Sequence, residues 1–226
     1  MAGFSDTAKD AALSNLIASY FQVSLHTADP GNTGASEVTG GSPPYARVST
    51  TWGTVGSPTQ DSVTGSAVVL NVPASTTIQY FGIWSPLVSA PSGLAVTAIA
   101  GGGTFAAATY FWKITGTNDA GETTVSNEAT VAIALNGSAS LSWSALPAGT
   151  TGVKVYRGTA TNSENILVAT LGVCQSFLDT GTAGTGATPP GSNTTQAWCT
   201  GGQLPAPVTY GSQGTYSGTP TLNAAG

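Results

Sequence analysis

Two segments of small, turn-forming residues divide this chain and leave a C-terminal piece that is too short to fold alone. The first is residues 86–93, and the second is residues 181–195, which are almost wholly Gly, Thr, Ala, Pro and Ser. Chains shorter than ~40 residues rarely fold without disulfides or metals, so residues 196–226 need a partner elsewhere in the chain. We therefore expect a discontinuous domain of residues 1–86 and 193–226, with residues 91–190 inserted in one of its surface loops.

The discontinuous domain is predicted to be one helix followed by short strands. Ser5 or Asp6 can serve as the N-cap, and apolar side chains recur at the helical period in Ala8, Ala12, Leu13, Leu16, Ile17 and Tyr20. From Phe21 the period changes to two, which predicts a strand with one buried face and with His26 on its polar side, facing solvent or bonded to a loop. Further strands are expected over residues 45–55, 62–72 and 77–85. The predicted fold class is mainly β, an antiparallel β-sandwich with one N-terminal helix.

The charge content limits the classes of partner. Charged residues make up only 7% of the chain, against roughly 25% in ordinary soluble domains, and the net charge is −5. A weak negative field does not attract nucleic acid, and no run approaches the ~20 apolar residues of a membrane span. The N-terminal residues lack the basic and apolar regions of a signal peptide, so we expect synthesis in the cytoplasm without export by that route. So few charges suit a subunit that is packed in an assembly.

The richest set of chemically active side chains lies in residues 24–47, which include the only histidine, His26. A catalytic triad is not expected, because the chain has no Gly-x-Ser-x-Gly elbow and no second histidine. The acidic residues are scattered singly, without the pair that glycoside hydrolysis needs, and there is no phosphate loop or dinucleotide motif. We therefore expect no enzyme, no catalytic residue and no cofactor.

The other charged residues of this stretch favour structural roles. Asp29 and Glu37 carry oxygen ligands, but their spacing matches no established calcium loop, so no metal site is expected. Asp29 is expected to cap the turn at Pro30-Gly31 through its side chain. Arg47 is expected to pair with Glu37 or Asp29 and so to fix the loop across the sheet.

Cysteine and tryptophan residues are few. Cys174 and Cys199 are too few for a disulfide framework and cannot complete a zinc site with one histidine; a single disulfide and two buried thiols both remain open.

The core aromatics are expected to include Trp84, Trp112 and Trp143. An exposed tryptophan on the inserted domain would suit sugar binding.

The inserted domain resembles fibronectin type III domains, which are immunoglobulin-like β-sandwiches. Residues 108–127, with Tyr110, Trp112 and Ile114 alternating inward and a turn at residues 118–121, resemble the hairpin of the last two strands of that fold. Residues 140–157 resemble its second and third strands. Because the hairpin-like piece comes first, the resemblance implies a permuted order of strands.

The discontinuous domain resembles small tail-fibre or minor tail proteins of tailed phages of actinobacteria. The resemblance rests on a short helix, the strand ending Ser24-Leu25-His26-Thr27-Ala28-Asp29-Pro30-Gly31, then Gly40-Gly41 and Tyr45-Ala46-Arg47, and later Gln79-Tyr80-Phe81-Gly82-Ile83-Trp84. It implies that residues 24–47 form part of an assembly surface, with the candidate residues His26, Asp29, Glu37, Tyr45 and Arg47.

These observations together predict a non-enzymatic virion protein. We expect it to contact other virion proteins in many copies and to display the inserted domain, which would bind host surface glycans weakly. A capsid decoration or head-fibre protein is the first alternative. An accessory module of a carbohydrate-active enzyme is the second, and the missing signal peptide and carboxylate pair count against it.

Overall fold

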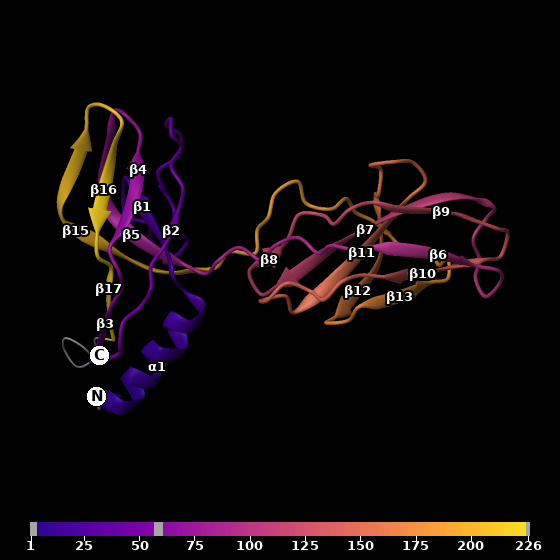
Figure 1. Cartoon of the computed structure of the whole chain (residues 1–226), viewed down its shortest axis with the longest axis horizontal. Coiled ribbons are helices and arrows are strands. Elements are labelled where there is room, and N and C mark those ends of the chain that lie inside the picture. The colour runs from indigo at the N-terminus through magenta and orange to yellow at the C-terminus, as the bar shows by residue number, and fades with distance from the viewer. Residues whose placement is uncertain (1–3, 57–60, 225–226) are drawn as a thin grey trace. The chain divides into compact units, whose positions relative to one another are not determined.

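The computed structural model describes residues 4–56 and 61–224 and divides into two compact units. The first unit is Met1–Pro86 with Ala197–Gly226, and the second unit is Leu87–Gln196 (Figure 1). The described residues form one helix and a series of antiparallel sheets, which confirms the predicted mainly β fold class. The second unit begins and ends a few residues outside the predicted limits of 91 and 190, and the predicted termini of the first domain lie outside the described residues.

Helix α1 (Asp6–Ser19) is capped by Ser5, whose side chain accepts a hydrogen bond from the backbone N–H of Ala8. This N-cap satisfies one of the free N–H groups of the first turn. Leu13 is buried, and Leu16, Ile17 and Tyr20 pack against the core of the first unit. Ala8 and Ala12 are exposed, so the buried stripe is narrower than the sequence period predicts.

The main sheet of the first unit has the strand order β15-β5-β1-β2. Its centre is β1 (Gln22–His26) paired with β5 (Thr76–Trp84), while β2 (Val48–Ser49) and β15 (Trp198–Tyr210) lie at the edges. Next to the Trp84–Trp198 pair, Ser85 N–H donates to Ala197 O at 2.9 Å and Ala197 N–H donates to Ser85 Oγ at 2.8 Å. The chain therefore leaves and re-enters the first unit at adjacent residues.

The C-terminal residues also pair with two shorter strands of the first unit. β16 (Gly214–Gly218) pairs with β4 (Val68–Val72), and β17 (Thr221–Asn223) pairs with β3 (Ser62–Thr64). The side chains of these strands form one apolar core together with those of β1 and β5. The fully buried residues of this core include Leu25, Val63, Leu70, Val72, Ile78 and Ile83. The tail thus supplies a neighbour to β3, β4 and β5.

The prediction that β1 has one buried face is wrong. Ser24 and His26, which the alternation assigns to the polar face, are both 0% exposed. The loop that follows β1 folds back over this face, where the His26 ring bonds to Ala35 O and packs edge-on against Trp198. Of the two alternatives for His26, the structure thus confirms the loop-bonded one. The polar face of this strand can be buried because polar groups of that loop form hydrogen bonds with it.

Two other predicted strands are broken in the structure. Within residues 45–55 only β2 is a strand, and Trp52 forms an isolated bridge with Gly65 while its ring N–H donates to Tyr20 O. Residues 62–72 split into β3 and β4 on either side of Gly65. A Cβ on Gly65 would overlap Thr50 Oγ1, so this close approach requires glycine.

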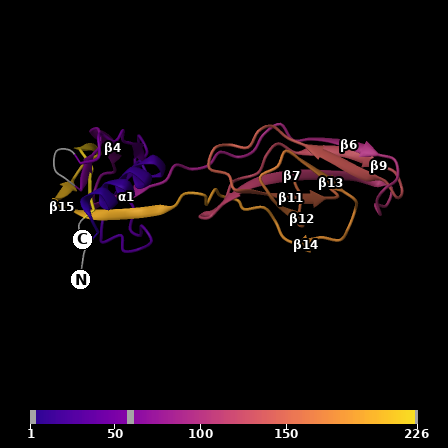
Figure 2. The same cartoon turned by 90° about the horizontal axis from the view of Figure 1, so that it is seen from below.

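The second unit is built from two sheets (Figures 1 and 2). One has the order β13-β10-β6, with β6 (Ala95–Ile99), β10 (Ser138–Ser142) and β13 (Ser176–Asp179). The other has the order β14-β12-β11-β7-β8, with β9 also paired to β7; its strands are β7 (Ala108–Asn118), β8 (Gly121–Glu122), β9 (Ala129–Ile133), β11 (Gly152–Gly158), β12 (Ile166–Gly172) and β14 (Thr185–Gly186). Trp112 and Trp143 lie in the core of this unit at 0% and 5% exposure.

The segment 181–195, predicted as a linker, is part of the second unit. It contains β14, and Thr194 N–H donates to Glu122 O. Thr195 is fully buried, and its hydroxyl accepts a hydrogen bond from Val88 N–H. Backbone hydrogen bonds that the composition does not reveal therefore hold this Gly- and Thr-rich segment to the unit.

A buried ion pair joins the two sheets of the second unit. Asp179 on β13 is 1% exposed and accepts two hydrogen bonds from Arg157 Nη1 on β11, both at 2.9 Å. Its carboxylate also accepts from Trp112 Nε1 on β7 and from Gly181 N–H, and the Arg157 guanidinium lies over the Phe105 ring. Both charges are thus hydrogen-bonded on several sides, which offsets their cost of burial.

We predict that Asp179→Asn destabilises the second unit by about 3–5 kcal/mol, because it leaves the buried Arg157 charge uncompensated. Urea unfolding followed by tryptophan fluorescence measures the change. Asp119→Asn removes a carboxylate from an exposed turn and is the matched control, expected within about 0.5 kcal/mol of the parent. Equal effects of the two substitutions would contradict this role of Asp179.

Candidate assembly site

The loop between β1 and β2, residues 27–47, doubles back along β1. Thr27 N–H donates to Ser36 O and Val38 N–H donates to Leu25 O, so that His26 lies opposite Glu37 as an isolated antiparallel bridge. We call residues 27–47 the covering loop. These bonds fix the start of the loop to the central strand of the first unit.

Glu37 is the hydrogen-bonding centre of the covering loop. Arg47 donates to it in a fork, from Nε to Oε1 at 2.8 Å and from Nη2 to Oε2 at 2.6 Å. The Tyr45 hydroxyl donates to Glu37 Oε1 at 3.1 Å and accepts from Leu25 N–H at 2.8 Å. Burial of its ring and the adjacent Glu37 carboxylate raise the pKa of Tyr45, so the phenol stays protonated and remains a donor. The far end of the loop is thus tied to β1 as well.

Arg47 connects this cluster to the aromatic side chains below it. Its guanidinium carbon lies 3.6 Å from the centre of the Trp84 ring, a cation–π contact. Trp198 meets Trp84 edge to face, with ring centres 4.9 Å apart. Gly34, at a φ of +71°, lies directly on both rings, and a Cβ at this position would overlap them. The loop therefore rests on two tryptophans from β5 and β15.

The hydrogen bonds of His26 specify its tautomer. Its Nδ1 is 2.7 Å from Ala35 O, which can only accept, so Nδ1 carries the proton. Nε2 then accepts from the Ser24 hydroxyl at 2.8 Å, and Ser24 Oγ accepts from Trp84 Nε1 at 2.9 Å. A continuous series of hydrogen bonds runs from the covering loop through the central strand to Trp84.

A serine bonded to a histidine is also part of a hydrolase triad, but this pair has a different environment. Both residues are 0% exposed, and a backbone carbonyl occupies the position that a triad gives to a carboxylate. Burial lowers the pKa of His26, which keeps the ring neutral. The arrangement can hold the loop in place but gives a substrate no access to the serine.

The five candidate residues of the sequence prediction therefore lie on different sides of the loop. His26 is buried beneath the loop, and the side chains of Glu37, Tyr45 and Arg47 are half-buried within it. The sequence left Glu37 and Asp29 open as partners of Arg47, and in the structure Arg47 pairs with Glu37. Asp29 is exposed and accepts from Gly31 N–H at 2.9 Å. The exposed loop positions are, apart from Asp29, small and uncharged: Ala28, Gly31, Asn32, Thr33, Ala35, Ser36, Thr39, Gly40, Gly41, Ser42, Pro43, Pro44 and Ala46.

Sequence reasoning missed three members of this network, Ser24, Trp84 and Trp198. Ser24 shares a strand face with His26, which is a signal for a common role. Trp84 was expected in the core, where it is 8% exposed, but its contact with Arg47 has no local signal. Trp198 comes from the returning tail, and no sequence pattern links it to residues so far away.

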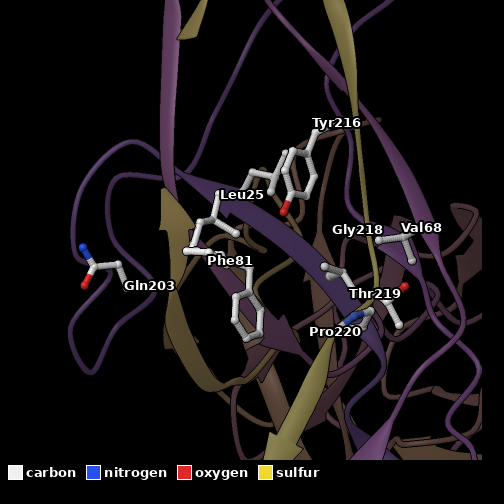
Figure 3. A pocket seen from close by; sticks show the side chains of 11 residues that line it. Leu25, Val68, Phe81, Gln203, Tyr216, Gly218, Thr219 and Pro220 are labelled. Carbon is white, nitrogen blue, oxygen red and sulfur yellow. The ribbon is translucent and has the colours of Figure 1, made fainter. Parts of the chain in front are cut away.

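An apolar pocket of about 200 Å³ lies on another part of the first unit (Figure 3). Leu25, Phe81 and Tyr216 contribute to its walls, together with Val68 and residues 218–220. The pocket forms where the pairing of β15 with β5 shifts in register between Gln203 and Val208, and Leu204 and Pro205 complete its lining. None of the lining residues is charged, so the pocket suits an apolar side chain rather than a reaction.

The described ranges of the chain are residues 4–56 and 61–224. They contain no group of three or more His, Cys, Asp or Glu residues that could hold a metal ion. Neither do they contain a helix that is long and apolar enough to cross a membrane. Cys174 and Cys199, whose pairing the sequence left open, are free and half-buried.

A protein-family model matches part of the first unit. Residues 9–90 match the family model described as Podophage GP4 fiber I protein gp80. The matched segment runs from α1 through β5 and contains the whole covering loop. The match supports a bacteriophage fibre protein, a structural component of the virion. No curated protein and no solved structure matches the chain.

We predict that Arg47→Lys destabilises the first unit by about 1–3 kcal/mol, because lysine loses the forked pair with Glu37 and the planar contact with Trp84. Thermal and urea unfolding measure the loss. Asp29→Asn, whose amide oxygen still accepts from Gly31, is the control and should change stability by less than about 0.5 kcal/mol. A lysine variant as stable as the parent would show that the fork is dispensable.

We also predict that the first unit loses stability as the pH falls below about 6.5, the usual pKa of histidine. Because the folded-state pKa of His26 is lowered, the unfolded chain takes up the proton first, and stability declines until the pH reaches the folded-state pKa. His26→Gln removes this titration, and His26 is the only histidine in the chain. Urea midpoints of both proteins between pH 7.5 and 4.5 test the prediction, and parallel curves would refute it.

Proposed function

We propose that the chain is a minor tail or tail-fibre component of a tailed phage of actinobacteria, in which the first unit attaches the chain to other virion proteins. The family match over residues 9–90 carries this proposal, because it falls on most of the helix, on β1 to β5 and on the covering loop of that unit. In this role the protein acts by assembly and not by catalysis.

The covering loop has the properties of an attachment surface. It is held from below by the Glu37–Arg47 fork and by the His26–Ser24–Trp84 series, so little ordering entropy remains to be lost on binding. Its exposed residues are small and nearly uncharged, which allows close approach of a neighbour without desolvation of ions. We propose that these exposed residues contact a second copy or another virion protein, and that His26, Glu37, Tyr45 and Arg47 position them.

The second unit is proposed to be a displayed fibronectin type III-like module. Its two sheets, with β10 between β6 and β13 and with β11 between β7 and β12, support this assignment in the permuted order of strands. Because the chain leaves and re-enters the first unit at Ser85 and Ala197, the module can be carried without interrupting the first core. Weak binding of host surface glycans would gain avidity from many copies on one particle.

We predict that replacing residues 87–196 by a short glycine linker preserves incorporation into virions and abolishes binding to host envelopes. The linker only has to join Pro86 to Ala197, next to the existing Ser85–Ala197 hydrogen bonds. Immunogold labelling of particles and a pull-down with host envelopes measure the two properties. Circular dichroism checks that the shortened chain is folded.

Each part of the proposal has its own contrary outcome. Loss of incorporation by a folded, shortened chain would place the attachment surface in the second unit. Undiminished envelope binding would remove host adhesion from that unit. Gold label on the capsid rather than the tail would instead support the head-fibre alternative.

A further inference from the structure

A pocket of about 280 Å³ opens on the second unit above a group of charged residues, one buried and two half-buried. Its lining comes from β7 through Lys113, from the β11–β12 loop at residues 162–165, and from residues 188–190 after β14. Neither the fibre family match, which ends at residue 90, nor the assembly role of the first unit accounts for it.

The floor of this pocket concentrates charge in a chain that has little. Lys113 Nζ lies 3.0 Å from Glu164 Oε2 and 3.6 Å from Glu128 Oε2, and it donates to Asn162 Oδ1 at 2.7 Å. Glu164 is 4% exposed, although it belongs to a loop between two strands. Three of the 15 charged residues thus meet beneath one small pocket. Buried ionic groups add little net stability, so their concentration in a pocket indicates a binding role.

The pKa values of the two carboxyl groups of the floor are shifted in opposite directions. Burial and a hydrogen bond to Glu128 raise the pKa of Glu164, while the same hydrogen bond lowers the pKa of Glu128. Lys113 carries the positive charge of the floor, and its ammonium group faces both carboxyl groups. Glu164 Oε1 is buried and has no hydrogen-bond partner among the described residues.

Glu128 also fixes the loop that forms one wall. Its carboxylate accepts from the Thr161 hydroxyl at 2.5 Å and from Asn162 N–H at 2.6 Å. Asn162 adopts a left-handed backbone conformation, with φ at +55°. Glu128 and Lys113 therefore hold Asn162 in position through its backbone N–H and its Oδ1. The amide N–H₂ group of Asn162 remains available at the rim.

The rim combines uncharged polar groups with an apolar face. Asn162, Ser163 and Asn165 are exposed and offer amide and hydroxyl groups, while Pro189 and Pro190 are half-buried and contribute ring C–H groups to the same lining. Hydroxyl groups of a ligand can both donate to and accept from such amides. The volume lies just below the roughly 300–1,000 Å³ of sites for drug-sized ligands, which fits a single ring-sized unit.

We propose that this pocket binds one neutral saccharide residue of the host surface, with the Asn162 and Asn165 amides bonding its hydroxyls and the two prolines packing on its C–H face. A neutral sugar is favoured over an anionic one because the floor has no free positive charge and the net charge of the chain is −5. The inference deepens the proposed function and rests on its assignment of host adhesion to the second unit.

The test is a titration of the full-length ¹⁵N-labelled chain at pH 7 with glucose, galactose, mannose, rhamnose and N-acetylglucosamine, with glucuronic acid as the anionic comparison. At least one neutral sugar should shift the side-chain amide signals of Asn162 and Asn165 with millimolar affinity. Asn165→Ala should weaken this binding by tenfold or more. Gln175→Ala removes an exposed amide that is not part of the pocket lining and should leave the affinity within twofold.

Glu164→Gln tests the floor separately. Glutamine has nearly the same shape as glutamate, and its amide can accept from Lys113 and donate to Glu128, so the variant should fold and bind as the parent does. No shift with any neutral sugar, or shifts with glucuronic acid alone, would overturn the proposal. So would equal effects of the Asn165 and Gln175 variants.

Envelope binding separates failure of this inference from failure of the proposed function. If deletion of residues 87–196 abolishes envelope binding but Asn165→Ala does not, host adhesion stands and the pocket is not its site. If the deletion has no effect while the sugar titration succeeds, the pocket stands as a saccharide site and the adhesion role falls.

Discussion

The pairing of β15 with β5 is the interaction on which the first unit depends. It brings residues after 197 back beside a strand that ends at Trp84, across an insertion of more than one hundred residues. It also places Trp198 against Trp84 and His26, so that the covering loop has a surface on which to fold. Without this pairing the covering loop would lose one of the two rings beneath it, and β3 and β4 would lose their partners in β17 and β16.

The scarcity of charge has a consistent physical meaning in the folded chain. Each of the five basic residues forms an ion pair with an acid: Lys9 with Asp61, Arg47 with Glu37, Lys113 with Glu164, Lys154 with Glu122 and Arg157 with Asp179. Most of these side chains are largely buried, so the charges fasten loops and sheets together. The outer surface of the covering loop is left almost neutral, which suits the close packing that we propose for it.

Local patterns predicted the local features of the fold. The cap at Ser5, the helix period and the series of short strands led to the mainly β class with one helix, which the structure confirms. The alternation after Phe21 failed for Ser24 and His26 because burial of a strand face depends on what covers it, and that is a loop and a distant tryptophan. Residues 181–195 were predicted to be a linker but are part of the second unit, because composition does not reveal the hydrogen bonds of Thr194 and Thr195.

Photo-cross-linking in assembled particles tests the central claim most directly, because it reports which surface of the chain meets other virion proteins. Benzoylphenylalanine placed at Asn32, exposed on the covering loop, is compared with the same residue at Thr97, exposed on β6 of the second unit. The account predicts cross-links to a virion protein or a second copy from position 32 and none from position 97. Cross-links from position 97 alone would contradict it.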